Sequence, residues 1–303
     1  MNRRKFISNT SLSLMSLALA SATGCNSMMN GKSRKKISVG AHVWIYASSL
    51  SGYDVSPVLT QIFSDMSYAG FDCIETMEHP LRSTLYTDQI KELIDQYKIK
   101  LIGSSYSGEM WNKEKHNQIY EDVDLIFTNM ASVGAKTFGV SVGKPGGRIK
   151  TGEELDNQAV LLKRIITLGK AKGIVLNLHN HTYEVENNMF DLRGTLKRIP
   201  DINLGPDLNW LLRAGVDPVA FLREFRKQIV FLHLRDQSVD GKWPESMGEG
   251  NIDFIEIADV LKEISFEGEA IIELAHEREF IPTRPLKESL KMSRDYMIKT
   301  MGI

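Results

Sequence analysis

The sequence predicts an α/β protein, a closed (β/α)8 TIM barrel that forms a single domain from residue 37 to residue 303. From Lys36 onward, short apolar runs alternate with longer amphipathic segments, and eight such pairs can be counted. Repeated strand-then-helix units imply a parallel sheet, and the roughly 265 residues available are close to the size of about 250 that is typical of a closed barrel. An open doubly wound sheet is the alternative, but no Gly-x-Gly-x-x-Gly motif follows the first strand.

The first four units occupy the first half of this region. Pro57 suits the first turn of a helix, so a helix is expected from about residue 56 to Gly70. Gly134 ends a helix expected at 115–133. The expected strands are residues 37–44, 71–76, 99–104 and 136–142, and a helix at 88–97 separates the second from the third.

The last four units follow a long helix at 153–172, whose apolar side carries leucine and isoleucine. Asp217-Pro218 is typical of a helix N-cap with proline in the first turn. The expected strands are residues 174–178, 202–206, 229–234 and 270–274, and the remaining helices are 189–199, one that starts at 217, 253–264 and 285–299.

The N-terminus predicts an export signal over residues 1–25. A basic start with Arg3-Arg4 precedes a short apolar run and small residues, and the arginine pair resembles a twin-arginine signal. Ala22-Thr23-Gly24-Cys25 resembles a lipoprotein cleavage box, although Ala22 stands where leucine is usual. An ordinary cleaved signal with an incidental cysteine is the alternative. We therefore expect an exported, periplasmic protein, with residues 26–36 as a polar tether and a lipid anchor at Cys25 as its one link to a membrane.

Composition narrows the classes of partner. The chain is 42% hydrophobic and 25% charged with a formal net charge of −1, which excludes a disordered chain and gives no electrostatic reason to bind nucleic acid. A small neutral ligand fits this charge balance better than nucleic acid does. Only Cys25 and Cys73 occur, so the mature domain has no disulfide partner for Cys73, which reads as a small buried residue.

Polar side chains stand at the ends of the fifth to eighth expected strands. These are His179, Asp207, His233 and Glu273. Because the C-terminal ends of all strands converge on one face of a barrel, the four become neighbours. Two imidazoles and two carboxylates suffice for a divalent metal with positions left open for substrate and water, and mixed N/O ligation favours Mn, Co, Fe or Zn over Ca.

Each member of this set has a structural alternative. Asp207 could cap the next helix, His233 could be a satisfied core residue, and Glu273 could pair with an arginine. Burying Glu273 unpaired in its apolar run would be costly, and a metal would offset that cost for the four together.

Six segments of the chain carry a resemblance to the sugar phosphate isomerase/epimerase family, the xylose-isomerase-like TIM barrels. They are Cys73-Ile74-Glu75, Leu178-His179-Asn180-His181, Leu204-Gly205-Pro206-Asp207, His233-Leu234-Arg235-Asp236, Gly248-Glu249-Gly250-Asn251-Ile252-Asp253 and Gly268-Glu269-Ala270-Ile271-Ile272-Glu273. The resemblance implies metal ligands on strands five to eight, which correspond to the same four residues.

Two positions depart from the family pattern. Many relatives have Glu-Asn-His where this chain has His179-Asn180-His181, and the epimerases use that glutamate with the one on strand eight as paired acid and base. The epimerase-like Asp-x-x-His ends in Trp210 here, and an indole suits stacking on a sugar face. The first departure argues against the epimerase mechanism with two carboxylates.

The chemistry that the resemblance implies is removal of a proton next to a carbonyl. We expect a metal-dependent lyase, or the related hydratase, that acts on a 3-keto-glycoside with loss of the C1 substituent. A keto-sugar epimerase or isomerase and a non-catalytic sugar-binding lipoprotein are the alternatives. The candidate bases are His181, Glu184 and Glu273, and the side chains expected to position the substrate are Glu75, Lys144, Trp210 and Arg235.

Overall fold

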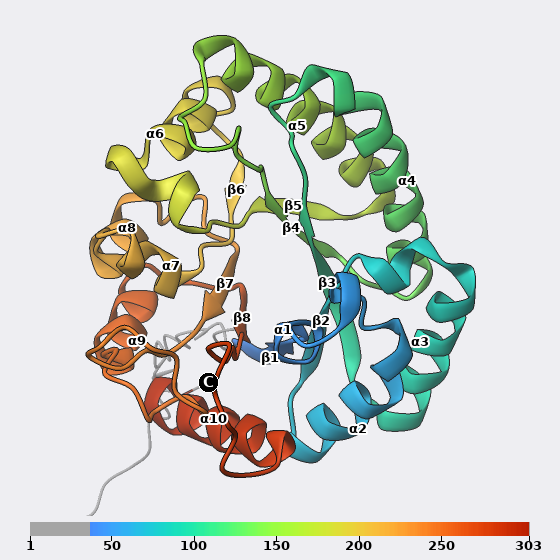
Figure 1. Cartoon of the computed structure of the whole chain (residues 1–303), viewed down its shortest axis with the longest axis vertical. Helices are drawn as coiled ribbons and strands as arrows, with labels where there is room; N and C mark the ends of the chain where they lie inside the picture. The colour runs from blue at the N-terminus through green and yellow to red at the C-terminus, as the bar shows by residue number, and fades with distance from the viewer. Residues whose placement is uncertain (1–36, 303) are drawn as a thin grey trace, which may run out of the picture. The chain divides into compact units, whose positions relative to one another are not determined.

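The computed structural model describes residues 37–302, which form a single ring of parallel strands (Figure 1). The strands are β1 (Ser38–His42), β2 (Cys73–Met77), β3 (Lys100–Ser107), β4 (Thr137–Ser141), β5 (Val175–Leu178), β6 (Asn203–Leu204), β7 (Phe231–Leu234) and β8 (Glu269–Ile272). Their order is β6-β5-β4-β3-β2-β1-β8-β7, so β1 pairs with both β2 and β8. Parallel bridges from Leu204 to Ile229 and from Asp207 to His233 join the two ends of the sheet. The predicted (β/α)8 barrel is confirmed.

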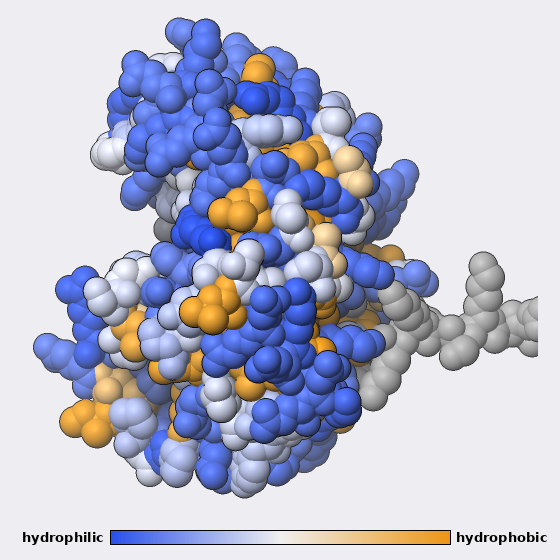
Figure 2. All heavy atoms as spheres, turned by 90° about the vertical axis from the view of Figure 1, so that its right-hand side faces the viewer, coloured by the Kyte–Doolittle hydropathy of each residue, from blue (hydrophilic) through white to orange (hydrophobic). Residues whose placement is uncertain are grey.

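Helices surround the strands (Figure 1). They are α1 (Trp44–Ala47), α2 (Leu59–Ala69), α3 (Thr84–Tyr97), α4 (His116–Ser132), α5 (Gly152–Lys172), α6 (Thr182–Arg198), α7 (Leu208–Arg213), α8 (Pro218–Glu224), α9 (Phe254–Glu263) and α10 (Leu286–Met301). Figure 2 shows the face on the side of α3 and α4, where hydrophilic side chains predominate and apolar ones are scattered. Within residues 37–302, no helix has the length and apolar character needed to cross a membrane.

The core lies between the barrel and its helices. Phe63, Phe127 and Phe138 are fully buried there, and the last two meet edge to face with ring centroids 4.8 Å apart. Gly103 permits the close approach of β3 to β4, because a Cβ atom at this position would lie 2.0 Å from Thr137 Oγ1. Tight packing of this kind fixes the strand ends that carry polar side chains.

The elements around β5 and β6 differ from the predicted ones. α6 begins at Thr182 rather than near 189, and it contains a break in which Asn187, Asn188 and Met189 all have positive φ. Asparagine tolerates this left-handed conformation better than most residues. β6 is two residues long, and Pro206 has no N–H with which to extend the ladder. The short helix α7, which follows β6 directly, was not predicted.

The predicted export signal at 1–25 and the polar tether at 26–36 lie outside the described residues. Cys73 is buried, as the sequence indicates, and it is a free thiol.

Candidate metal and substrate site

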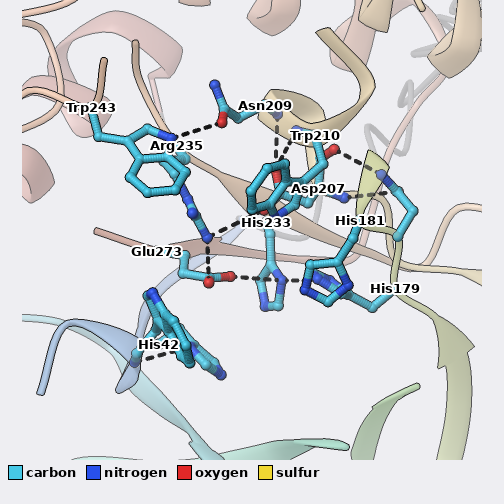
Figure 3. Close-up of polar contacts among 12 residues, drawn as sticks. His42, His179, His181, Asp207, Asn209, Trp210, His233, Arg235, Trp243 and Glu273 are labelled. Atoms are coloured by element: carbon cyan, nitrogen blue, oxygen red, sulfur yellow. Dashed lines mark hydrogen bonds and ion pairs between the residues drawn. The ribbon is translucent and has the colours of Figure 1, made fainter. Parts of the chain in front are cut away.

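Four of the predicted site residues converge at the C-terminal mouth of the barrel (Figure 3). They are His179 after β5, Asp207 after β6, His233 within β7 and Glu273 after β8. One ligand atom from each lies within 4.8 Å of the others. All four are buried, at 8%, 0%, 1% and 7% exposure respectively. The barrel thus brings together the cluster that strand ends predict, and we call it the His/Asp cluster.

Asp207 serves two purposes with its two oxygens. Oδ1 accepts the backbone N–H groups of Asn209 at 2.8 Å and Trp210 at 3.1 Å, and so caps α7. Oδ2 is buried without a hydrogen-bond partner and lies 3.6 Å from Arg235. Asn180 fixes the backbone of Asp207, because its amide donates to the Asp207 carbonyl and accepts from the Asp207 N–H. The cap predicted as an alternative role therefore coexists with an oxygen that is available to a ligand.

His233 is held by a carboxylate on its far side. Its Nε2 contacts Glu75 Oε2, while its Nδ1 lies 2.9 Å from His179 Nδ1 and 3.2 Å from Glu273 Oε2. Burial lowers the pKa of His233, but the carboxylates of Glu75, Glu273 and Asp207 outweigh burial and raise the pKa to about 9. So many anionic groups around one imidazole favour a cation at this position.

The donor set fits a divalent metal ion. Two imidazole nitrogens and two carboxylates converge, and Asp207 Oδ2 is a buried acceptor with no hydrogen bond. Such mixed ligation suits Mn, Co, Fe or Zn. Glu75 supplies the carboxylate that commonly orients a metal-bound histidine from behind.

Glu273 also forms the arginine pair that the sequence leaves open. Its Oε1 receives a hydrogen bond from Arg235, which is 3% exposed. Burial raises the pKa of Glu273, but Arg235 and the neighbouring imidazoles outweigh burial and hold the pKa below its ordinary value. The carboxylate is therefore anionic at neutral pH.

Trp210, Trp243 and Arg235 lie beside the His/Asp cluster (Figure 3), and Arg213 packs against the two indoles. Trp210 and Trp243 meet edge to face with ring centroids 5.7 Å apart. The guanidinium of Arg235 lies 5.4 Å and 4.9 Å from their centroids, and that of Arg213 lies 5.2 Å and 4.1 Å away. Trp243 Nε1 donates to Asn209 Oδ1 at 2.9 Å, which fixes the indole. Flat aromatic and cationic surfaces of this kind suit a sugar ring and its hydroxyl groups.

The loop that carries Trp243 is anchored by Asp236. The Asp236 carboxylate accepts the backbone N–H groups of Gly248 and Gly250 at 2.9 Å each, and that of Ile252 at 3.3 Å. A Cβ atom on Gly250 would lie 2.2 Å from Asp236 Oδ1, so this position requires glycine. The close packing of the loop against Asp236 thus explains the glycine at position 250.

His181 lies on the other side of the cluster, and Ser141 contacts its Nδ1 atom. Its ring centroid is 5.0 Å from that of His179 and 5.6 Å from that of Trp210. Ser141 Oγ lies 2.5 Å from Glu184 Oε1 and 3.0 Å from His181 Nδ1. When Ser141 donates to Glu184, the contact with His181 places the hydrogen on Nδ1 and a lone pair on Nε2. Burial lowers the pKa of His181 to about 4, which keeps the ring neutral.

A model of the xylose isomerase-like TIM barrel family matches residues 63–296. The chain belongs to this family. An uncharacterised protein of Methanocaldococcus jannaschii is 30% identical over 157 residues, which is 46% of this chain, and the chain spans about half (50%) of that protein's length.

Solved structures of other barrels are similar in fold. D-allulose 3-epimerase from Methylomonas sp., in complex with D-allulose, matches with a TM-score of 0.71 and 14% identity over 88% of this chain and 98% of that one. The 3-keto-D-glucoside 4-epimerase from E. coli, in its apo form, matches with a TM-score of 0.63 and 16% identity over 86% of this chain and 100% of that one. At these identities the likeness shows the shared barrel.

Two residues of this xylose isomerase-like barrel, Glu75 and Glu184, have contacts that differ from those expected for their predicted roles. Glu75 is 0% exposed beneath the cluster, and its contact with His233 argues against the predicted contact with substrate. Glu184 is predicted as a base, but its Oε2 accepts the His181 N–H at 2.8 Å and its Oε1 accepts from Ser141 and from Val142 N. It accepts a backbone N–H at the start of α6 and fixes Ser141.

The remaining predicted substrate residue, Lys144, does not reach the His/Asp cluster. It is exposed, and its Nζ lies 5.3 Å from the ring centroid of Tyr183. Arg235 and Trp210 lie beside the cluster, as the sequence predicts.

Sequence reasoning missed three residues near the site. His42, the last residue of β1, is buried, accepts the Trp44 N–H on Nδ1 and contacts Ser105 Oγ through Nε2. Trp243 lies in a loop between elements, and Ser141 is a small residue at the end of β4. The position of His42 and Ser141 at strand ends was the available signal, whereas nothing in the loop sequence indicates where Trp243 lies.

Proposed function

We propose that this protein is a divalent-metal-dependent enzyme that removes a proton next to the carbonyl of a keto-sugar, and that it is a lyase on 3-keto-glycosides. The observation that carries the proposal is the combination of the His/Asp cluster with one neutral imidazole, His181, beside it. The carboxylates nearby are engaged otherwise: Glu75 holds His233, and Glu184 holds Ser141. One accessible base suits elimination better than an exchange between two carboxylates. We also propose that the enzyme acts outside the cytoplasm, as residues 1–25 predict.

His179, Asp207, His233 and Glu273 would hold the metal. When bound, a divalent metal polarises the substrate carbonyl and stabilises the negative charge that develops as the adjacent C–H bond is broken. Asp207 keeps its ligand oxygen in place because the other oxygen is fixed by α7. Glu75 contacts Nε2 of His233, so a metal would displace the hydrogen on Nδ1 and bind there.

His181 is the proposed general base. In the tautomer whose Nδ1–H donates to Ser141, its Nε2 accepts the proton from C2 of the sugar. Trp210 and Trp243 would bind the sugar ring, and Arg235 would donate hydrogen bonds to its oxygens. These groups orient C2 toward the base. Such positioning supplies a large share of the rate enhancement of an enzyme.

The elimination balances without an external oxidant or reductant. The C2–H electron pair forms a C1=C2 double bond, and the C1–O bond to the leaving group breaks. The leaving group takes up the proton that His181 removed. The ketone at C3 is retained, so the products are an unsaturated keto-sugar and a free alcohol.

Epimerisation is the second candidate, and the likeness to D-allulose 3-epimerase and to 3-keto-D-glucoside 4-epimerase in fold supports it. In that case the proton returns to the same carbon from the opposite face. Glu273 is the carboxylate placed for such a transfer, although Arg235 holds it as an anion.

The test incubates a 3-keto-glucoside with the metal-loaded protein in D2O and follows the products by NMR. A lyase releases the free alcohol together with an unsaturated keto-sugar. An epimerase incorporates deuterium at the reacting carbon while the glycosidic bond stays intact. Failure of both reactions, in a protein that purifies without a divalent metal and does not take one up when it is supplied, would favour a non-catalytic sugar-binding protein.

A variant separates the base from the metal site. His181→Asn should lower kcat by about 10²-fold to 10⁴-fold, the usual contribution of a general base. The same variant should retain the full metal content, because His181 is not in the His/Asp cluster. An unchanged kcat would contradict the assignment of His181.

A further inference from the structure

A second cavity lies beside the site, between the loop that follows β4 and the broken start of α6. Its volume is about 200 Å³. At about 30 Å³ per water molecule, this space corresponds to roughly seven waters, which is room for one substituted ring rather than for an oligosaccharide. The residues that matter here are Lys144, Pro145, Ile149, Tyr183, Asn187 and Phe190, and we call this cavity the α6 pocket.

Tyr183 connects the α6 pocket to the His/Asp cluster. Its ring stacks on His181 with an angle of 8° between the planes and centroids 5.6 Å apart. The His181 ring in turn lies 5.0 Å from that of His179. A ligand bound at the cluster would reach the pocket by extending along these two rings. The Tyr183 hydroxyl is fixed by Ser141 at 2.7 Å, so the ring holds a fixed position at the edge of the pocket.

The walls of the α6 pocket combine apolar surface with one available cation. Phe190 is 40% exposed and Ile149 is 55% exposed. The Lys144 ammonium lies over the Tyr183 ring, and no carboxylate among residues 37–302 is within ion-pair distance of it. This composition suits a ring with hydroxyl substituents, which can stack and accept a hydrogen bond.

The other charges at the α6 pocket are paired, except for the exposed carboxylate of Glu186. Lys150 and Asp191 form a buried ion pair at its floor, and Gln158 bonds to both of them. Arg148 pairs with Glu154 at 2.6 Å. Lys144 is therefore the cation available to a ligand, and the floor is fixed by bonds that a ligand need not disturb.

The segment of α6 that lines the pocket has a strained backbone. Asn187, Asn188 and Met189 adopt φ values of 53°, 58° and 59° in succession. A left-handed conformation costs non-glycine residues roughly 1–2 kcal/mol each, and strain of this kind concentrates at ligand sites. The break presents Asn187 and Phe190 to the pocket instead of continuing the helix.

We propose that the α6 pocket binds the leaving group of a glycoside whose sugar lies at the His/Asp cluster, and that this group is a six-membered ring. This inference rests on the proposed function, and it narrows the substrate class to glycosides with a ring-bearing aglycone. The second sugar of a disaccharide and an aromatic aglycone share this shape. Stacking on Phe190 serves both, whereas a hydrogen bond from Lys144 serves the hydroxyl groups of a second sugar.

The first experiment compares kcat/KM for methyl, p-nitrophenyl and disaccharide 3-keto-glucosides. The ring-bearing substrates should exceed the methyl glycoside by about tenfold. Phe190→Ala should reduce the ratio of ring-bearing to methyl substrate by about threefold to tenfold, the range of one aromatic contact. Lys144→Met should reduce the ratio for the disaccharide more than for the aryl substrate. Val160→Ala, an exposed apolar residue on α5 outside the pocket, is the matched control and should keep the ratio.

A second measurement separates this inference from the proposed function. Isothermal titration compares p-nitrophenyl and methyl glucosides that lack the ketone and cannot react. Tighter binding of the aryl glucoside that is lost in Phe190→Ala supports the pocket even if no keto-glucoside is turned over, in which case only the proposed function fails. Equal ratios and equal affinities in wild type and Phe190→Ala would overturn the pocket assignment.

Discussion

His233 directs its two ring nitrogens to opposite sides of the barrel mouth. Nε2 contacts the fully buried Glu75, and Nδ1 lies 2.9 Å from His179 Nδ1 and 3.2 Å from Glu273. The far carboxylate occupies the Nε2 side, so a metal would replace the hydrogen on Nδ1. The relationship joins β2 to β7 and explains a glutamate inside an apolar strand.

Glu75→Gln should therefore weaken metal binding without removing a ligand. Loss of a carboxylate behind a metal-bound histidine usually costs about 10-fold to 100-fold in affinity. Competition against a chelator measures the change. Glu92→Gln, at an exposed position on α3, is the control and should bind metal as the wild type does. Equal affinities in the two variants would contradict the role of Glu75.

Gly103→Ala should destabilise the barrel strongly. The added Cβ would lie 2.0 Å from Thr137 Oγ1 and 2.4 Å from the Thr137 carbonyl oxygen, so β3 and β4 would have to separate. Overpacking against backbone suggests a loss of roughly 3 kcal/mol in the free energy of unfolding. Urea unfolding measures it. Gly152→Ala, where a Cβ meets nothing within 4 Å, should leave stability unchanged or slightly raised. Similar stabilities for both variants would disprove the steric explanation.

Cys73 should resist alkylation in the folded protein. Burial raises the pKa of its thiol from 9.0 to about 12, and the residue is 1% exposed. Because the unfolded chain loses this proton near pH 9 and the folded chain keeps it, the contribution to stability is present below pH 9 and declines as the pH rises toward 12. Iodoacetamide at pH 8.5 should label Cys73 only after urea is added, with peptide mapping to distinguish it from Cys25. Rapid labelling without urea would show that the thiol is accessible.

The fold and the His/Asp cluster could be predicted because both depend on regular repetition. Apolar runs locate the strands, and the geometry of a barrel brings strand ends such as Asp207 and Glu273 together. The roles of Glu75 and Glu184 could not be read in the same way. Whether a carboxylate faces substrate or holds a neighbour depends on the partner across the barrel, here His233 and Ser141.

The positions of loop residues were still harder to predict from the sequence. Trp243 reaches the site because Asn209 and the Asp236 anchor fix a segment with no periodic pattern. The left-handed break in α6 likewise depends on tertiary contacts, since only the Asn187-Asn188 pair hints at it in the sequence.

Asp207 offers a way to separate the helix cap from the metal ligand. Asparagine is as good an N-cap as aspartate, so Asp207→Asn should keep the bonds to the N–H groups of Asn209 and Trp210. The Oδ2 position, however, becomes an uncharged amide that is a poor metal ligand. We expect a large loss of bound metal with a folded barrel, measured by elemental analysis and circular dichroism. Asp207→Ala should lose the metal and, in addition, about 1 kcal/mol of stability from the missing cap. If Asp207→Asn retains stoichiometric metal, the carboxylate is a cap alone and the ligand set must be sought elsewhere at the barrel mouth.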